Sequence, residues 1–460
     1  MVSKDMTVGS PAKLILAFTL PMFIGSVFQQ VYNMADSAIV GRFVGPNALA
    51  SVGTSFPVIF LLASMLMGLT MGAGVVISQF FGAKQLDKVK RAISTALLFQ
   101  LFAGMAITVM GLFISRPLLV LLRTPPEIIN DSATYMRIFF GGSMFMFAYY
   151  GFAAILRALG DSKTPLYFMI LANVVNIGLD LYFVAVMGWG VAGVAWATLI
   201  AQALSAVTCG IYLYVKVPLF RFSRSEFTFD TEILKTMVRI GLPTSVQQSL
   251  ASVGMMAVQA LVNSFGSVTM AAFTAAGRMD SFAMMPIMNM GMAISTYTGQ
   301  NIGAGKIKRI GEGLKATLIM VVISSAIIGF LVFTFGPQLI QVFITAEHVD
   351  VISQGVDYMR TVSIFYIAFG VLMVVNGVLR GAGDAMIPMY TTVTSLLVRV
   401  GVAYWLSSIP SIGYRGIWWG IPAGWTLASI VPVYRYLSGK WREKAVVRGE
   451  MFANATAAGE

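Results

Sequence analysis

The sequence predicts an all-α polytopic membrane protein with twelve transmembrane helices, arranged as two six-helix bundles that are parallel repeats. Three observations predict this fold class: the composition, the length of the apolar runs and an internal repeat. Of the 460 residues, 57% are hydrophobic and 11% are charged, and the mean hydropathy is +0.81. Soluble proteins carry about 25% charged residues, so the composition excludes a soluble globular fold.

Twelve runs are long and apolar enough to cross a bilayer, which takes about 20 residues of helix. They lie at 14–38, 50–77, 93–115, 134–156, 166–187, 191–215, 240–263, 270–298, 314–336, 355–378, 389–408 and 414–437. The first run is too long for a cleavable signal peptide and lacks a small-residue cleavage site. Membrane β-strands would alternate over about 10 residues rather than stay apolar, so the spans are helices.

The basic residues indicate the orientation of these spans. With a cytoplasmic N-terminus, 23 of the 31 Lys and Arg residues lie in cytoplasmic segments. The other eight are all arginines, namely Arg42, Arg116, Arg123, Arg137, Arg278, Arg360, Arg399 and Arg415. Cytoplasmic loops carry such an excess of basic residues. We therefore expect both termini in the cytoplasm and the protein in a bacterial-type plasma (inner) membrane, and the net charge of +12 needs no nucleic-acid partner.

The second half of the chain repeats the first. The sequence 156–161, Leu-Arg-Ala-Leu-Gly-Asp, returns at 379–384 as Leu-Arg-Gly-Ala-Gly-Asp, and Gly190, Gly193 and Trp196 return as Gly413, Gly416 and Trp419. Because each unit has six spans, both copies enter the membrane from the same side, as in one class of secondary transporters. We predict an N-lobe at 1–215, a cytoplasmic linker at 216–239, a C-lobe at 240–440 and a cytoplasmic tail at 441–460.

Composition also limits the chemistry that the chain can perform. A single cysteine, Cys209, and a single histidine, His348, exclude a disulfide framework and a Cys/His metal cluster. Gly303-Ala304-Gly305-Lys306 lacks the spacing of a phosphate-binding loop. We therefore expect no catalytic residues and no cofactor, and an ion gradient rather than ATP as the energy source.

Polar residues inside the first and fifth spans predict a cation site. Gln29, Asn33 and Asp36 are spaced four and three apart, and therefore share one helical face. Acids within a membrane span are costly and usually functional. An alternative for the amides is ordinary hydrogen bonding between helices, worth about 0.6 kcal/mol on average.

The fifth span repeats this arrangement with Asn173, Asn176 and Asp180, and the sixth places Thr198 and Gln202 on one face. Hard cations prefer oxygen ligands, so two carboxylates with amide and hydroxyl neighbours could hold H⁺ or Na⁺. The spacing does not decide between these two ions.

The second half does not repeat the acids, because Asp180 is matched by Ala403 and Asn176 by Arg399. It has instead a methionine-rich eighth span with Asp280, Met288 and Met292. Such flexible, polarisable surfaces accommodate varied ligands, so these residues are candidates for substrate binding together with Gln29, Asn33, Asn173 and Gln202. Ordinary core or lipid-facing packing of the methionines is the alternative, and Asp280 could instead meet Arg399 across helices.

These residues resemble the multidrug and toxic compound extrusion (MATE) transporters over about 10–440. The likeness rests on Asn33-Met34-Ala35-Asp36, on the sequence 299–305 (Gly-Gln-Asn-Ile-Gly-Ala-Gly) and on both Leu-Arg-x-x-Gly-Asp loops. Within the family the chain is similar to the DinF-like branch. Other branches place acids in the seventh and tenth helices, where this chain has none at 247–251 and 365–369.

The resemblance implies a V-shaped pair of six-helix bundles and export of cationic or amphiphilic drugs by alternating access, in exchange for H⁺ or Na⁺. It assigns cation coupling, and a possible Na⁺ site, to Asp36, Asp180, Asn176 and Thr198. The expected partners are small-molecule drugs and the lipid bilayer, and the expected state is a monomer.

Two other functions remain open from sequence. A flippase for a lipid-linked precursor would share the helical plan but needs a large cationic cavity, and only Arg278 and Arg399 are plausible inward-facing arginines. An integral membrane enzyme would need a polar catalytic cluster at a membrane face, and none stands out.

Overall fold

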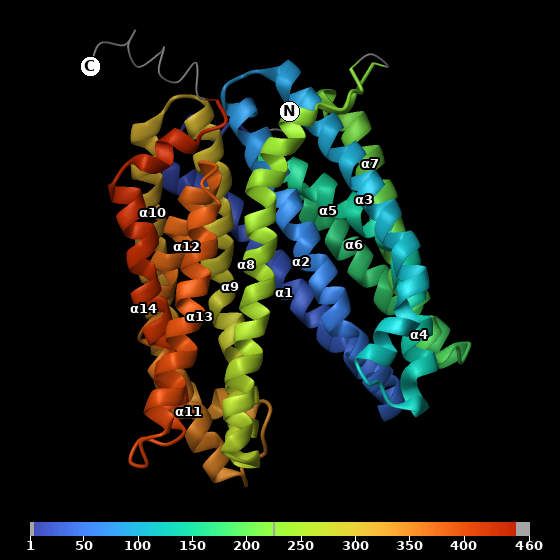
Figure 1. Cartoon of the computed structure of the whole chain (residues 1–460), viewed down its shortest axis with the longest axis vertical. Coiled ribbons are helices and arrows are strands. Elements are labelled where there is room, and N and C mark those ends of the chain that lie inside the picture. Colours follow the sequence, from blue (N-terminus) through green and yellow to red (C-terminus); the bar gives the residue numbers. More distant parts are fainter. Residues whose placement is uncertain (1–3, 224–225, 448–460) are drawn as a thin grey trace. The chain divides into compact units, whose positions relative to one another are not determined.

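The computed structural model describes residues 4–223 and 226–447, which are helical with no strand in these two ranges (Figure 1). The first half contains α1 (Pro11–Phe43), α2 (Pro46–Gly82), α3 (Leu86–Leu121), α4 (Pro126–Gly141), α5 (Ser143–Ala158), α6 (Lys163–Asp180), η1 (Leu181–Val186), α7 (Gly190–Lys216) and η2 (Pro218–Phe220). The second half contains α8 (Thr231–Ser264), α9 (Ser267–Gly303), α10 (Ile307–Gln341), α11 (Val349–Ser363), α12 (Tyr366–Gly381), α13 (Met386–Ser407), α14 (Arg415–Leu437) and η3 (Lys440–Lys444).

Two of the predicted spans are broken helix pairs. The predicted span 134–156 corresponds to α4 and α5, which meet at a bend of 48°, and 355–378 corresponds to α11 and α12, which meet at 49°. Counting each pair as one span gives two sets of six helical spans, as the sequence predicts. Within the described residues, seven helices are both long and apolar enough to cross a membrane, or nine with the bent pairs. The helices α8, α9 and α14 are 34, 37 and 23 residues long but are not among these candidates.

The chain divides into two compact units, and the division does not follow the sequence order strictly. The N-lobe contains 4–5 and 20–241 of the described residues, and the C-lobe contains 6–19 and 242–447. The start of α1 thus belongs to the C-lobe, whereas the start of α8 belongs to the N-lobe. The segment 216–239, which the sequence suggests as a linker, holds the first turns of α8 and packs as part of the N-lobe.

Polar side chains of the C-lobe fix the segment that precedes α1. The Gln300 side chain accepts a hydrogen bond from the Met6 backbone N–H (2.8 Å), and the Asn301 side chain donates to the Met6 carbonyl (3.2 Å). Lys306 donates to the carbonyl of Thr7 (3.0 Å). The amide side chains of the 299–305 motif therefore serve the fold, by satisfying a backbone that has no helical partners.

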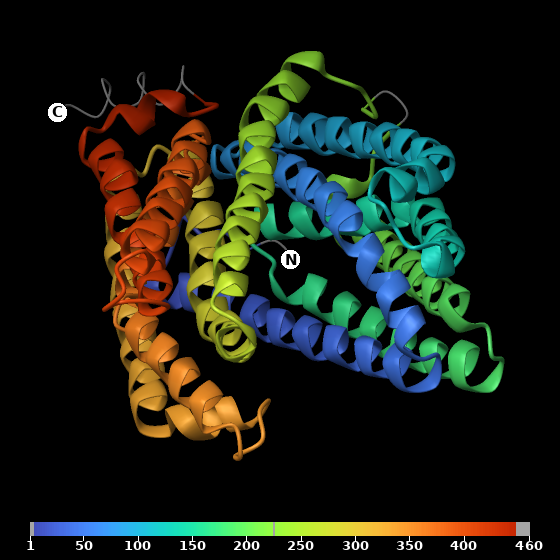
Figure 2. The ribbon, with the colours of Figure 1, turned by 60° about the horizontal axis from the view of Figure 1, so that its bottom comes forward.

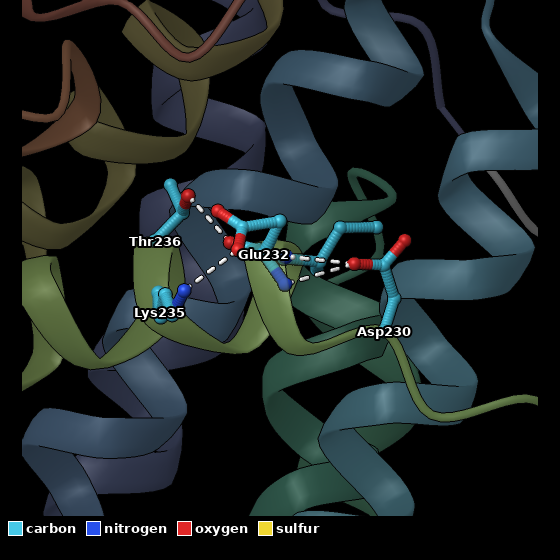
Figure 3. A network of polar contacts seen from close by, with 5 residues as sticks. Asp230, Glu232, Lys235 and Thr236 are labelled. Carbon is cyan, nitrogen blue, oxygen red and sulfur yellow. Dashed lines mark hydrogen bonds and ion pairs between the residues drawn. The ribbon is translucent and has the colours of Figure 1, made fainter.

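The segment before α8 is held in the N-lobe in a similar way. Ser94 donates to the Thr228 carbonyl (2.8 Å), and Thr95 accepts from the backbone N–H of Asp230 (3.0 Å). The Asp230 carboxylate accepts from the backbone N–H groups of Glu232 and Ile233 at 3.0 and 3.1 Å, which starts α8 (Figure 3). A carboxylate at this position satisfies free N–H groups and complements the helix dipole.

Close packing of α9 on α12 depends on glycines. A Cβ atom at Gly377 would lie 2.3 Å from the carbonyl oxygen of Gly291, and one at Gly381 would lie 2.2 Å from that of Ser295. The two glycines are four residues apart and form the small-residue stripe that lets membrane helices approach closely.

Candidate cation-coupling site

Two carboxyl groups face one another inside the N-lobe. Asp36 lies on α1 within the part that belongs to the N-lobe, and Asp180 is the last residue of α6 and is fully buried. The two groups are within hydrogen-bonding reach of each other once one of them carries a proton. As carboxylates they lack donors: Asp36 Oδ1 and both Asp180 oxygens are buried and accept no hydrogen bond.

The helix changes its geometry directly after Asp180. Residues Leu181–Val186 form a π-helix that continues α6. π-Helices are rare, and this one begins directly after the buried Asp180 and forms the end of the helix. The local backbone therefore marks the same position as the buried carboxylate.

The predicted polar neighbours meet beside this pair. Asn176 Nδ2 donates to Thr198 Oγ1 over 3.4 Å, and Asn176 Oδ1 is buried without a partner. Thr198 Oγ1 donates to the Val194 carbonyl at 3.0 Å. The orphaned oxygens of Asp36, Asp180 and Asn176 suit a proton or a hard cation, which takes oxygen ligands.

A cavity of about 80 Å³ within the N-lobe is lined by Asn176 and Thr198, whereas Asp36 and Asp180 are not among its lining residues. Five of the residues singled out from the sequence line it, namely Gln29, Asn173, Asn176, Thr198 and Gln202. One water molecule takes about 30 Å³, so the cavity has room for two or three waters. A drug-sized molecule needs roughly 300–1,000 Å³, so in this structure the cavity suits an ion and its water.

Asn33, the remaining residue of the first-span group, is more exposed than Gln29 and Asp36. Gln29 donates from Nε2 to Asn33 Oδ1 over 3.3 Å, which confirms that the two amides share a helical face. Asn33 itself is exposed, whereas Asp36 is half-buried.

The sequence did not single out two tyrosines that belong to this site. Tyr32 lines the same small cavity as Thr198 and lies close enough to both carboxyl groups to interact with their charges. Tyr135, which is buried on α4, also lies near both acids. For Tyr32, the available sequence signal is its place one helical turn before Asp36, on the same face of α1.

Asp280 lies in a separate cluster in the C-lobe. Both of its carboxylate oxygens accept hydrogen bonds, one from Tyr358 (3.2 Å) and one from Tyr366. Arg399 is close enough for an electrostatic interaction. No ion pair joins Arg399 to Asp280 among the described residues, and Arg399 Nε is buried without a partner. Each tyrosine uses one lone pair of one oxygen, so the role of Asp280 in substrate binding stays a prediction.

The two methionine candidates differ in exposure. Met288 is 50% exposed and Met292, one turn later on α9, is half-buried. Met290 is buried in the C-lobe, so packing accounts for part of the methionine-rich stretch and leaves Met288 at the surface.

The fold and this site together define an α-helical membrane transporter built from two six-helix repeats, with a buried carboxyl pair in the first repeat only. A family model, MatE, matches residues 21–182 and again 243–405. The chain therefore belongs to the MATE family of transporters. The two matches begin 222 and end 223 residues apart, which confirms the internal repeat.

Similar proteins agree over nearly the whole length. The probable multidrug resistance proteins YoeA and YpnP of Bacillus subtilis (strain 168) are 30% and 31% identical to the chain. The first comparison covers 94% of both chains, and the second covers 96% of this chain and 98% of YpnP. A crystal structure of MATE in complex with MaL6 is 26% identical with a TM-score of 0.89, and covers 95% of this chain and 99% of that chain.

Proposed function

We propose that the protein is a multidrug efflux antiporter, which exports cationic or amphiphilic compounds in exchange for H⁺ or Na⁺. The observation that carries this proposal is the pair of facing carboxyl groups, Asp36 and Asp180, whose buried oxygens lack donors. Relatives named as multidrug resistance proteins support the substrate class.

The coupling follows from electrostatics. A buried ion without a partner costs several kcal/mol even after relaxation, and two adjacent carboxylates repel each other. The state in which the site is closed to water therefore needs a cation between Asp36 and Asp180. A ligand shifts the equilibrium between two states by its differential affinity for them, so a gradient of that cation can drive the export of a second ligand.

The neighbouring groups divide into two sets in this proposal. Asn176 and Thr198 complete the cation site with Asp36 and Asp180, and provide the further oxygens for a Na⁺ ion. Gln29, Asn173 and Gln202 line the small cavity beside it and hold the water through which the cation enters.

Drug binding uses larger and less polar surfaces. Asn33 and Met288 are exposed, and Met292 lies on the same face of α9 as Met288. The excess of basic residues in the predicted cytoplasmic segments supports a plasma-membrane protein with both termini inside the cell.

Transport into inverted membrane vesicles tests the function. Uptake of a fluorescent cationic dye is measured with a pH gradient alone, with a Na⁺ gradient alone and with neither. The proposal predicts uptake of the dye with only one of the two gradients, and that result identifies the coupling ion. The accumulated dye should be lost when that gradient is collapsed. Equal uptake without either gradient would contradict antiport.

A further inference from the structure

Among the candidate membrane spans of the described residues, α10 is the most apolar. A groove of about 410 Å³ runs along it within the C-lobe. The groove is lined by Gly311, Leu314, Lys315, Leu318, Ile319, Val322 and Ile323. Its volume falls in the range of small-molecule sites, about 300–1,000 Å³.

The lining is apolar apart from one charged residue. Ile319, Val322 and Ile323 are 47–55% exposed, so their side chains face the surroundings of the helix rather than a protein core. Lys315 lies in the half of the groove nearer to the start of α10, between Gly311 and Leu318. In a membrane this combination matches a hydrocarbon chain with a charged group at one end.

Gly311 leaves space near the start of the groove. A Cβ atom there would meet only the Tyr436 hydroxyl, at 3.7 Å, which is ordinary contact, so alanine would fit. A side chain as large as leucine would extend into the groove beside Tyr436.

The turn η3 brings further positive charge to this end of the groove. The ring of Trp441 stacks on that of Tyr436 at 5.6 Å, and its Nε1 donates to the Tyr436 carbonyl at 3.0 Å. Arg442 is exposed and lies 5.6 Å above the Trp441 ring. In Figure 2 these last described turns (red) lie across the end of the C-lobe helices.

The charges around the groove sum to a positive value. Lys308 and Lys315 are seven residues apart on one face of α10, and both are exposed. Glu312 shares this face and offsets one of them, and Arg442 adds another positive charge. Basic pockets on the cytoplasmic side of membrane helices bind anionic lipid head groups.

We propose that this groove is a binding site for an anionic phospholipid of the cytoplasmic leaflet. One acyl chain lies against Leu318, Val322 and Ile323, and the phosphate lies near Lys315 and Arg442. The site goes beyond the transport function and depends only on the cytoplasmic placement of the start of α10.

Native mass spectrometry of the full chain in mild detergent tests the site with dioleoyl-phosphatidylglycerol and dioleoyl-phosphatidylcholine. Each basic residue near a membrane surface contributes about 1 kcal/mol to binding anionic lipid, which is about fivefold. Lys315→Gln should therefore lower phosphatidylglycerol affinity about fivefold, and Glu312→Gln should raise it about fivefold. Gly311→Leu should fill the groove and lower the binding of both lipids.

Matched controls separate the groove from general effects. Lys163→Gln removes an exposed lysine from the N-lobe, and Gly329→Leu adds the same side chain to α10 five turns away, where no atom lies within 4 Å. Both should leave lipid affinity unchanged. Equal affinity for the two lipids, or the same losses in the controls, would overturn the proposal. A gain of lipid sites in a chain that ends at Val447 would assign the groove to residues 448–460 instead.

Discussion

Thr198 on α7 accepts a hydrogen bond from the amide of Asn176 on α6 over 3.4 Å, and Tyr32 on α1 lines the same small cavity. Side chains from three helices of the N-lobe therefore meet beside the carboxyl pair. A substitution at Tyr32 therefore changes the polar surroundings of the carboxyl pair and leaves Asp36 and Asp180 in place.

Tyr32→Phe should weaken cation coupling and leave the maximal rate of dye transport close to normal. The substitution removes a hydroxyl that lies near both acids, and one polar contact is worth about 0.5–1.5 kcal/mol, so the cation concentration for half-maximal uptake should rise about two- to tenfold. Tyr182→Phe, which removes a 51% exposed hydroxyl on the π-helix, is the control and should change nothing. An unchanged half-maximal concentration for Tyr32→Phe would remove this tyrosine from the site.

Two ion pairs of the C-lobe should differ sharply in their effect on stability. Arg435 and Asp384 pair at 2.7 Å with side chains that are 19% and 4% exposed, whereas Arg415 and Asp357 pair at 3.0 Å with 62% and 37% exposure. Breaking a buried pair costs about 3–5 kcal/mol because it strands a charge, and an exposed pair contributes about 0–1 kcal/mol. Thermal unfolding in detergent should therefore show a large loss for Arg435→Gln and a small one for Arg415→Gln.

Gly377 on α12 should be needed for the close contact between α12 and α9. Gly377→Ala places a methyl group 2.3 Å from a backbone carbonyl of α9, and should lower the free energy of unfolding by about 1–3 kcal/mol. Gly401→Ala, where nothing lies within 4 Å, should leave stability unchanged or raise it by up to about 1 kcal/mol. Equal melting temperatures for the two variants would show that the helices can separate to admit the methyl group.

The segment before α8 should become less stable in acid. The hydrogen bond from Lys90 to Glu226, 2.6 Å long, and then the one from the Ser223 backbone N–H lower the pKa of Glu226 from 4.5 to about 2. A lowered pKa in the folded state stabilises the fold above pH 4.5, and this contribution is lost as the pH falls from 4.5 towards 2.

The melting temperature of Glu226→Gln should therefore lie below that of the wild type at pH 7, and the difference should shrink below about pH 4.5. Glu232→Gln removes an exposed acid paired with Lys235 (79% and 73% exposed) and is the control. A difference that stays constant with pH would contradict the role of Glu226. High salt should reduce the difference in melting temperature between the wild type and Glu226→Gln at pH 7, because exposed charges are screened.

Hydropathy and repeats predicted the twelve spans and the two halves, because twenty apolar residues and a constant offset are local signals. The acids and amides of the N-lobe were also visible, since spacings of three and four place residues on one helix face. The bends after α4 and α11 were not, because a bent pair is as apolar as a straight helix.

Tertiary contacts explain what the sequence could not show. Tyr358 and Tyr366 donate hydrogen bonds to both oxygens of Asp280 from helices about eighty residues away, and no pattern near Asp280 reveals them. The same holds for the segment at Met6, whose partners Gln300 and Asn301 entered the sequence analysis only as part of the 299–305 motif.

Ion movement measured together with drug movement in proteoliposomes tests the central claim most directly. Drug added to liposomes that contain the wild-type protein should evoke an opposite flux of H⁺ or Na⁺, recorded with an ion-sensitive dye. Asp36→Asn and Asp180→Asn should each abolish this flux while drug binding to the purified variants remains, and Asp131→Asn, at an exposed acid of α4, should retain it. Drug-evoked ion flux at the wild-type rate in either aspartate variant would contradict coupling through the carboxyl pair.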